Sequence, residues 1–87
     1  MNQTKWYLYV VECSDGTLYT GITTNINRRL NEHNYGSRSA KYTRSRRPVK
    51  LRHVKQYEDR SQASSAEYKF KKLTRKRKLE IINDKAR

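Results

Sequence analysis

The chain has few of the residues that cross-link or interrupt a small domain. Among its 87 residues are one cysteine, one proline and three glycines. The lone cysteine, Cys13, excludes an internal disulfide and a cysteine-rich zinc site, and we expect it to be a small, half-buried strand residue. No segment approaches the roughly 20 apolar residues of a membrane-spanning helix. The N-terminal residues MNQTKW contain no apolar signal core, so we expect a cytoplasmic protein that does not enter the membrane.

Acidic residues are also scarce. The chain has eight Asp and Glu and 21 Lys and Arg, which gives a formal charge of +13 and favours a polyanionic partner. An anionic membrane is disfavoured because the sequence has no amphipathic helix with aromatic residues. Residues 36–50 and 69–78 are basic and contain no acid, although solvated charged faces normally mix both signs. We expect these two segments to contact nucleic acid through Lys41, Arg44, Arg46, Arg47, Arg75 and Lys76.

Aliphatic residues are few as well, and together with the high charge they place the composition in the range of disordered chains. Seven tyrosines and one tryptophan argue for folding, because aromatic side chains are the large core pieces that this chain has. Regular hydrophobic periodicity supports the same conclusion. We expect one small domain over residues 1–83 and a frayed tail over residues 84–87.

Residue patterns divide the chain into short strands and helices. Strands are indicated by runs of β-branched and aromatic residues between turn residues. Helix starts are indicated by the N-cap residues Asn25, Asp59 and Thr74, and Gln62 three residues after Asp59 resembles a capping box. The predicted elements are strands over residues 6–13, 17–23 and 49–57, helices over 25–34, 59–73 and 74–83, and a long basic loop over 35–48.

The turn at residues 14–16, Ser-Asp-Gly, decides how the first two strands pair. As a three-residue hairpin loop it sets Val11 opposite Tyr19 and Tyr9 opposite Gly21, with the two tyrosines on one face of the sheet. A two-residue Asp-Gly loop would instead put the tyrosines on opposite faces. We favour the three-residue loop, in which Gly21 leaves open space above the Tyr9 ring.

The first predicted helix turns polar groups toward the sheet. Ile26, Arg29, Leu30 and His33 have the spacing of a single helix face, and Arg28 lies almost opposite. A guanidinium that faces protein needs a partner or a ligand. A structural ion pair and a ligand site are equally compatible with the spacing of Arg29.

Glu67 has a similar place on the next helix, at the border of its apolar stripe and in a region with few acids. A surface pair with Lys71, four residues later, accounts for it simply. A lone carboxylate in a basic domain is also a place where a divalent cation can bind.

These residues form a recognisable set. "YLY" at residues 7–9, "YTG" at 19–21, "TTNINRRLNEHN" at 23–34 and "AKYTRSRRPVKL" at 40–51 resemble the GIY-YIG nuclease superfamily, and most of all its small stand-alone bacterial members. The resemblance implies an α+β fold: a small three-stranded antiparallel sheet flanked by about three helices. It also implies that Tyr9, Tyr19, Arg29 and His33 are catalytic and that Glu67 binds the metal.

The activity that the resemblance implies is hydrolysis of DNA phosphodiester bonds by an endonuclease that uses one divalent cation, Mg²⁺ or Mn²⁺, and no small-molecule cofactor. Arg29 would stabilise charge on the attacked phosphate. Tyr9 would pass a proton from the attacking water, with the pKa of its hydroxyl lowered by a nearby cation or with the help of His33. The sequence leaves open which of the two is the base. A nucleic-acid-binding module that kept the fold but cleaves poorly is the alternative function.

Overall fold

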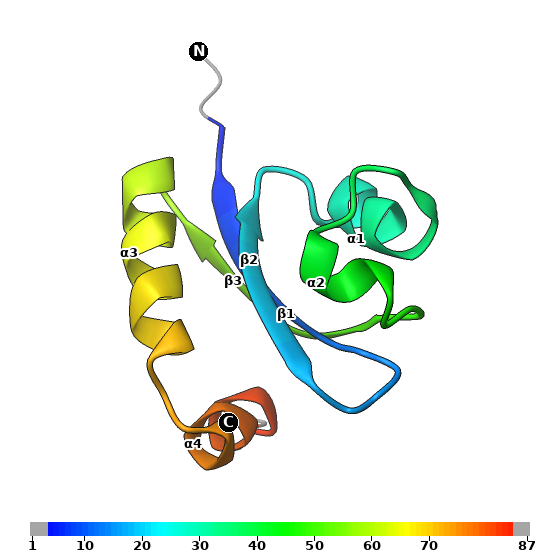
Figure 1. Cartoon of the computed structure of the whole chain (residues 1–87). Helices are drawn as coiled ribbons and strands as arrows, with labels where there is room; N and C mark the ends of the chain where they lie inside the picture. The colour runs from blue at the N-terminus through cyan, green and yellow to red at the C-terminus, as the bar shows by residue number, and fades with distance from the viewer. Residues whose placement is uncertain (1–3, 85–87) are drawn as a thin grey trace.

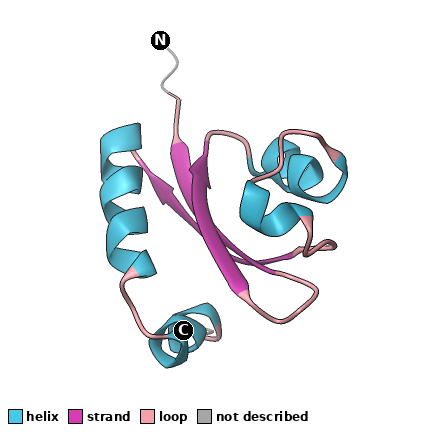
Figure 2. Cartoon of the chain, viewed as in Figure 1, coloured by secondary structure: helices cyan, strands magenta, loops and turns pink. Residues whose placement is uncertain are grey.

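The computed structural model describes residues 4–84 and contains one antiparallel sheet with helices on both of its faces (Figures 1 and 2). The strands are β1 (Trp6–Glu12), β2 (Leu18–Thr23) and β3 (Lys50–Tyr57), in the order β2-β1-β3. The helices are α1 (Ile26–Tyr35), α2 (Lys41–Arg44), α3 (Arg60–Lys71) and α4 (Arg75–Ile82). The α+β class and the three-stranded antiparallel sheet are confirmed.

The short helix α2 is a correction, because the sequence predicts a loop throughout residues 35–48. In the structure the backbone N–H groups of Thr43 and Arg44 both donate to the carbonyl of Ala40, which closes one helical turn. Four residues are too few to show a helical period, and Ala40 gives no side-chain capping bond. The described part of the chain therefore has four helices rather than three.

The central strand β1 is buried on both faces and divides the core into two clusters. Tyr9 and Val11 face α1 and pack with Ile26 and Leu30. Leu8 and Val10 face α3 and α4 and pack with Phe70 and other apolar residues of these two helices. Figure 1 shows α1 and α2 on one side of the sheet and α3 and α4 on the other. The alternation of one strand thus supplies both cores.

The predicted helix starts are confirmed. Asn25 accepts from the N–H of Arg28, Asp59 accepts from that of Gln62, and Thr74 accepts from that of Arg77. These bonds satisfy N–H groups that the first turn of a helix leaves free. The Gln62 side chain reaches the N–H of residue 58, one residue before the expected position in a capping box.

The hairpin has the predicted three-residue loop and register. Val11 pairs with Tyr19 and Tyr9 pairs with Gly21, while Gly16 closes the turn at φ 87°. The space above Gly21 is a correction, because the Tyr9 ring fills it. A Cβ at Gly21 would lie 2.5 Å from the Tyr9 hydroxyl oxygen. Gly21 therefore lets Tyr9 lie across β2 rather than leaving room for another group.

The helices are short and carry many charges. Among residues 4–84, none of them is long and apolar enough to cross a membrane. Of the expected tail at 84–87, only Asp84 belongs to the described residues.

Candidate active site

The site is centred on Tyr9, which projects from the middle of β1 and is 3% exposed as a residue. Its hydroxyl oxygen lies 2.8 Å from Nε2 of His33, and Nε of Arg29 donates to it at 3.4 Å. Burial raises the pKa of Tyr9 to about 12, although the bond and the charge of Arg29 act in the opposite direction. The hydroxyl is therefore protonated at neutral pH.

His33 is a fully buried polar side chain next to Tyr9, with no exposed surface. It lies in the last turn of α1, and its second ring nitrogen, Nδ1, is 2.8 Å from the hydroxyl oxygen of Thr43 in α2. Burial, followed by the positive charge of Arg29, lowers the pKa of His33 to about 4. The imidazole is thus neutral at pH 7 and bonded on both sides.

Tyr19 lies on the same face of the sheet as Tyr9, as the register predicts. Its ring meets His33 edge-on with centroids 5.5 Å apart and stacks on Tyr42 at 5.9 Å. The guanidinium of Arg46 lies 4.0 Å above the Tyr42 ring. The two motif tyrosines therefore flank one histidine. Tyr19, Tyr42 and Arg46 also form a stack of two rings and one guanidinium.

Arg29 has the first of the two roles that its spacing left open, a structural ion pair, and part of its guanidinium stays available for a ligand. Its Nη1 donates to Glu32 at 2.9 Å and to the carbonyl of Arg38 at 2.8 Å, while Nε points at Tyr9. Among residues 4–84 nothing binds Nη2, and Arg29 lines a polar hollow of about 510 Å³ together with Arg28, Glu32 and Arg38. Sequence reasoning missed Glu32, although its position three residues after Arg29 was a usable signal.

Glu67 projects from α3 and pairs with Lys71 at 3.1 Å, the simpler of its two predicted roles. Its charge also adds to the rise in the pKa of Tyr9, after burial and alongside Tyr19. Within residues 4–84 no group of three or more His, Cys, Asp or Glu side chains is placed to hold a metal ion. A single carboxylate does fit Mg²⁺ or Mn²⁺ that keeps its waters and shares phosphate oxygens with a substrate, but not a structural metal.

The predicted nucleic-acid contacts divide into exposed and engaged side chains. Arg47 is engaged: it donates to the carbonyl of His33 at 2.6 Å, to the carbonyl of Gly36 and to Ser39 Oγ at 3.0 Å. These carbonyls include ones that the end of α1 leaves free, so Arg47 supports the fold. Arg46 pairs with Asp15 at 3.0 Å. The remaining candidates are exposed: Lys41, Arg44, Arg75 and Lys76. Two of them also donate to backbone carbonyls, Arg44 to those of Ser37 and Ser39 at 3.4 Å and Arg75 to that of Gly16 at 3.0 Å.

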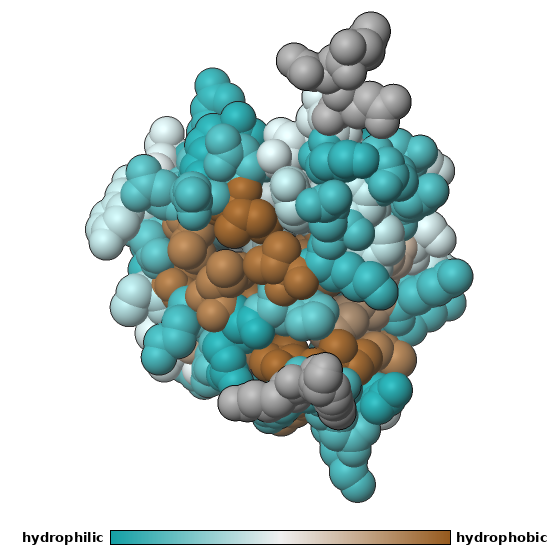
Figure 3. Space-filling model, turned by 180° about the vertical axis from the view of Figure 1, so that it is seen from behind, coloured by the Kyte–Doolittle hydropathy of each residue, from teal (hydrophilic) through white to brown (hydrophobic). Residues whose placement is uncertain are grey.

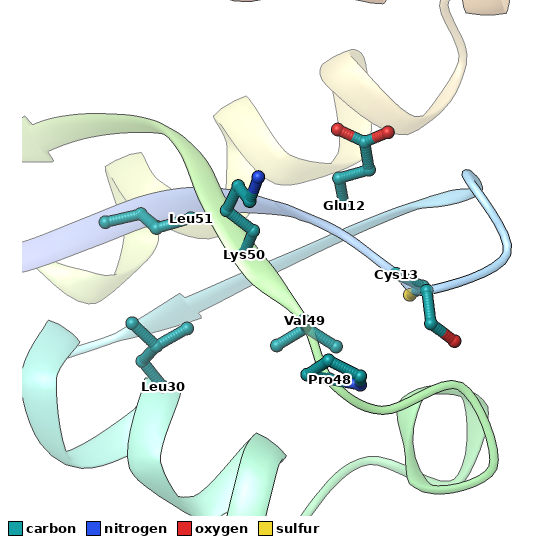
Figure 4. A pocket seen from close by; sticks show the side chains of 8 residues that line it. Glu12, Cys13, Leu30, Pro48, Val49, Lys50 and Leu51 are labelled. Carbon is teal, nitrogen blue, oxygen red and sulfur yellow. The ribbon is translucent and has the colours of Figure 1, made fainter.

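A separate apolar hollow of about 490 Å³ lies between the end of β1, α1 and the start of β3 (Figure 4). Leu30, Val49 and Leu51 line it together with Cys13, and none of the predicted catalytic residues does. Cys13 is buried rather than half-buried, and burial raises the pKa of its thiol. Seen from behind, apolar side chains also gather in patches framed by hydrophilic ones (Figure 3). The polar site around Tyr9 is thus distinct from this apolar hollow.

Residues 5–80 match the family model of the GIY-YIG catalytic domain. The chain belongs to the GIY-YIG family, which supports a nuclease-type function on nucleic acid in general. Within that family it is similar to a UPF0213 protein of Desulfotalea psychrophila, 56% identical over 82 residues that cover 92% of this chain and 74% of the relative. A UPF0213 protein of Syntrophus aciditrophicus is 53% identical over 78 residues, 90% of each chain.

Two solution NMR structures have the same fold. The UPF0213 protein of Bacillus halodurans gives a TM-score of 0.58 at 37% identity and covers 90% of this chain and 82% of that one. A protein of E. faecalis gives a TM-score of 0.61 at 44% identity and covers 92% and 85%. The resemblance inferred from the motifs is therefore confirmed at the level of family and fold.

Proposed function

We propose that the protein is a cytoplasmic endonuclease that hydrolyses DNA phosphodiester bonds with the help of one divalent cation, Mg²⁺ or Mn²⁺. The observation that carries the proposal is the bonded group formed by Arg29, Tyr9 and His33. A buried tyrosine that contacts both a neutral histidine and an arginine is more than nucleic-acid binding requires. Such a group can move a proton next to a stabilised anion.

In this proposal the water that attacks the phosphate gives a proton to the Tyr9 oxygen while the Tyr9 proton passes to His33. Tyr9 then never has to ionise in a buried site, where charge is unfavourable, and the positive charge forms on His33. The resulting hydroxide bonds to phosphorus, and the leaving oxygen departs with the electron pair of the broken P–O bond and takes a proton from water. Arg29 is oriented by Glu32 and donates through Nη2 to the phosphate oxygens, on which negative charge accumulates.

Glu67 is the residue that would hold the divalent cation, which would supply charge stabilisation to the phosphate and to the leaving oxygen. Because the described residues offer one carboxylate here, cation binding at this site depends on the nucleic acid being present. The exposed Lys41, Arg44, Arg75 and Lys76 supply sequence-independent attraction to the backbone.

The deciding experiment measures cleavage of plasmid and branched DNA with Mg²⁺ or Mn²⁺ for the wild type, Glu67→Ala and Glu67→Gln. We expect both variants to lose metal-dependent cleavage while keeping the melting temperature and an equal or slightly higher DNA affinity, because a charge near the phosphate is removed. Lys71→Ala is the matched control: it breaks the same ion pair but keeps the carboxylate, so cleavage should persist.

Retained cleavage in folded Glu67→Ala would remove the metal site from the proposal. Tight DNA binding by a wild type that cleaves no substrate would favour the alternative function, a nucleic-acid-binding module with a nuclease fold.

A further inference from the structure

Thr43 lies under His33 on the side opposite Tyr9. Its side chain has no exposed surface, and its hydroxyl oxygen is 2.8 Å from Nδ1 of His33 and 3.1 Å from the carbonyl oxygen of Ala40. The chain therefore contains a continuous line of contacts from Tyr9 through both ring nitrogens of His33 to Thr43 and the backbone of α2. Nothing in the resemblance or in the helix pattern assigns a role to Thr43.

The contacts at the Tyr9 end of this line determine where the hydroxyl hydrogen of Tyr9 points. The Tyr9 hydroxyl is buried, and Arg29, which contacts it, can only donate. Among residues 4–84 the remaining partner of that hydroxyl is Nε2 of His33, so Nε2 must accept the Tyr9 proton. A neutral imidazole carries one N–H, and that N–H must therefore be on Nδ1.

The Thr43 end leads to the same arrangement. The Thr43 hydroxyl lies within donating distance of the carbonyl oxygen of Ala40, which also accepts from the backbone N–H groups of Thr43 and Arg44. In this arrangement the single hydroxyl hydrogen of Thr43 points at Ala40. The Thr43 oxygen then has only lone pairs to offer to His33, which requires a hydrogen on Nδ1. The contacts at the Thr43 end are thus compatible with the tautomer that the Tyr9 end requires.

We propose that Thr43 is a positioning residue that holds His33 in the Nδ1–H tautomer, so that Nε2 is free to take the proton of Tyr9. This inference rests on the proposed hydrolysis and extends it from Tyr9 and His33 into α2. In the transfer, the Tyr9 O–H bond breaks, an N–H bond forms at Nε2, and the water proton replaces the one that Tyr9 gave up. The Nδ1–H bond stays directed at Thr43 and stabilises the imidazolium that forms.

The opposite tautomer would stop the transfer. With its hydrogen on Nε2, His33 would donate to the Tyr9 oxygen and would have no lone pair on that side. In the serine-protease triad, where an aspartate holds a histidine in the required tautomer, the wrong tautomer lowers turnover by about 10⁴-fold. A neutral hydroxyl holds a ring less firmly than a carboxylate does, and we expect a smaller loss here, of at least about tenfold.

The test compares Thr43→Val, which keeps the shape and loses the hydroxyl, with Thr43→Ser, which keeps the hydroxyl. Long-range ¹H–¹⁵N spectra of ¹⁵N-histidine-labelled protein report the tautomer of His33 directly, and His53→Gln assigns the signals of the only two histidines. We expect Nδ1–H in the wild type and in Thr43→Ser. In Thr43→Val we expect an increased Nε2–H population and single-turnover cleavage at least about tenfold slower.

The inference would be overturned by Nε2–H in the wild type, a result that needs no variant to fold. It would also be overturned by an unchanged tautomer in Thr43→Val, or by equal rate losses in the two variants, which would indicate packing alone. Absence of cleavage by the wild type would refute the proposed function, while the tautomer spectra would still decide whether Thr43 positions His33.

Discussion

Gly21→Ala is predicted to displace Tyr9 without removing any polar group of the site. A Cβ at residue 21 would lie 2.5 Å from the Tyr9 hydroxyl oxygen and 2.8 Å from Cζ, closer than real Cβ contacts. Tyr9 is packed between β2 and α1, so its ring has to move and its bond to His33 has to lengthen or break.

The expected loss of stability follows from three contributions. Overpacking a buried site lowers the free energy of unfolding by about 1–3 kcal/mol, and losing one hydrogen bond lowers it by about 1 kcal/mol. Replacing glycine by alanine within a strand returns about 0.5–1 kcal/mol. The net loss is about 2 kcal/mol, which lowers the melting temperature of a domain of this size by roughly 10 °C. Cleavage should fall further than stability does, because the displaced atom is the one proposed to receive the water proton.

The assay is thermal unfolding of Gly21→Ala in two backgrounds, wild type and Tyr9→Leu. Leucine lacks the three Tyr9 atoms that would meet the new Cβ, so adding alanine in that background should leave the melting temperature equal or slightly higher. An equal loss in both backgrounds would show that Gly21 is required by something other than the Tyr9 ring. A Gly21→Ala protein with unchanged melting temperature and rate would refute the packing of Tyr9 across Gly21.

Two further predictions concern charge. Neutralising the exposed Lys41 and Arg44 should flatten the slope of log affinity against log salt concentration by about 0.9 for each phosphate contact that is lost. Arg47→Gln is the control and should mainly lower the melting temperature. An unchanged slope in the Lys41 and Arg44 variant would show that α2 faces away from the nucleic acid. The free energy of unfolding should fall as pH drops from 6.5 toward 4, because the unfolded chain protonates His33 before the folded one does. Burial also lowers the pKa of His53, so the free energy of unfolding should be measured by urea denaturation in a His53→Gln background. A free energy of unfolding that does not change with pH in that background would contradict the lowered pKa of His33.

The sequence predicts well what depends on local pattern. The turn at residues 14–16 fixes the register, and the register puts Tyr9 and Tyr19 on one face. The helical period separates Arg29 and His33 from Arg28, and the structure turns the first two toward Tyr9 while Arg28 stays exposed. These predictions need only the periods of strand and helix, together with side-chain caps that act within three residues.

Contacts made by residues 36–49, the segment that joins α1 to β3 and contains α2, could not be predicted from local sequence pattern. Thr43 reaches His33 ten residues back, and Arg47 reaches the carbonyl of the same residue. Neither spacing belongs to a helical or strand period, and α2 is too short to show one of its own. Arg47 in particular is indistinguishable from the other cations of its basic segment until its carbonyl partners are known.

The two carboxylates associated with the site both have cationic partners on their own helices. Glu32 pairs with Arg29 and Glu67 pairs with Lys71, three and four residues apart. Local, partly exposed pairs of this kind contribute only a few tenths of a kcal/mol. Under the proposed function, an incoming phosphate can therefore share Arg29 with Glu32 through the free Nη2, and a divalent cation can replace Lys71 at little cost. In that proposal, substrate and metal bind to side chains that already have local partners rather than filling an empty site.

The variant Glu32→Gln separates the effect of Glu32 on DNA affinity from its effect on the cleavage rate. DNA affinity should rise by up to about fivefold, because a competing anion beside Arg29 is removed and we take the value of this partly exposed pair as about 1 kcal/mol. Single-turnover cleavage should nevertheless fall, because Glu32 also directs Nε of Arg29 toward the Tyr9 hydroxyl. Asn31→Asp is a matched control, since it adds a charge at the neighbouring exposed position and should weaken binding slightly without changing the single-turnover rate at saturating DNA. Tighter binding together with faster cleavage in Glu32→Gln would mean that Glu32 only restrains Arg29, and weaker binding would mean that Glu32 itself faces the substrate.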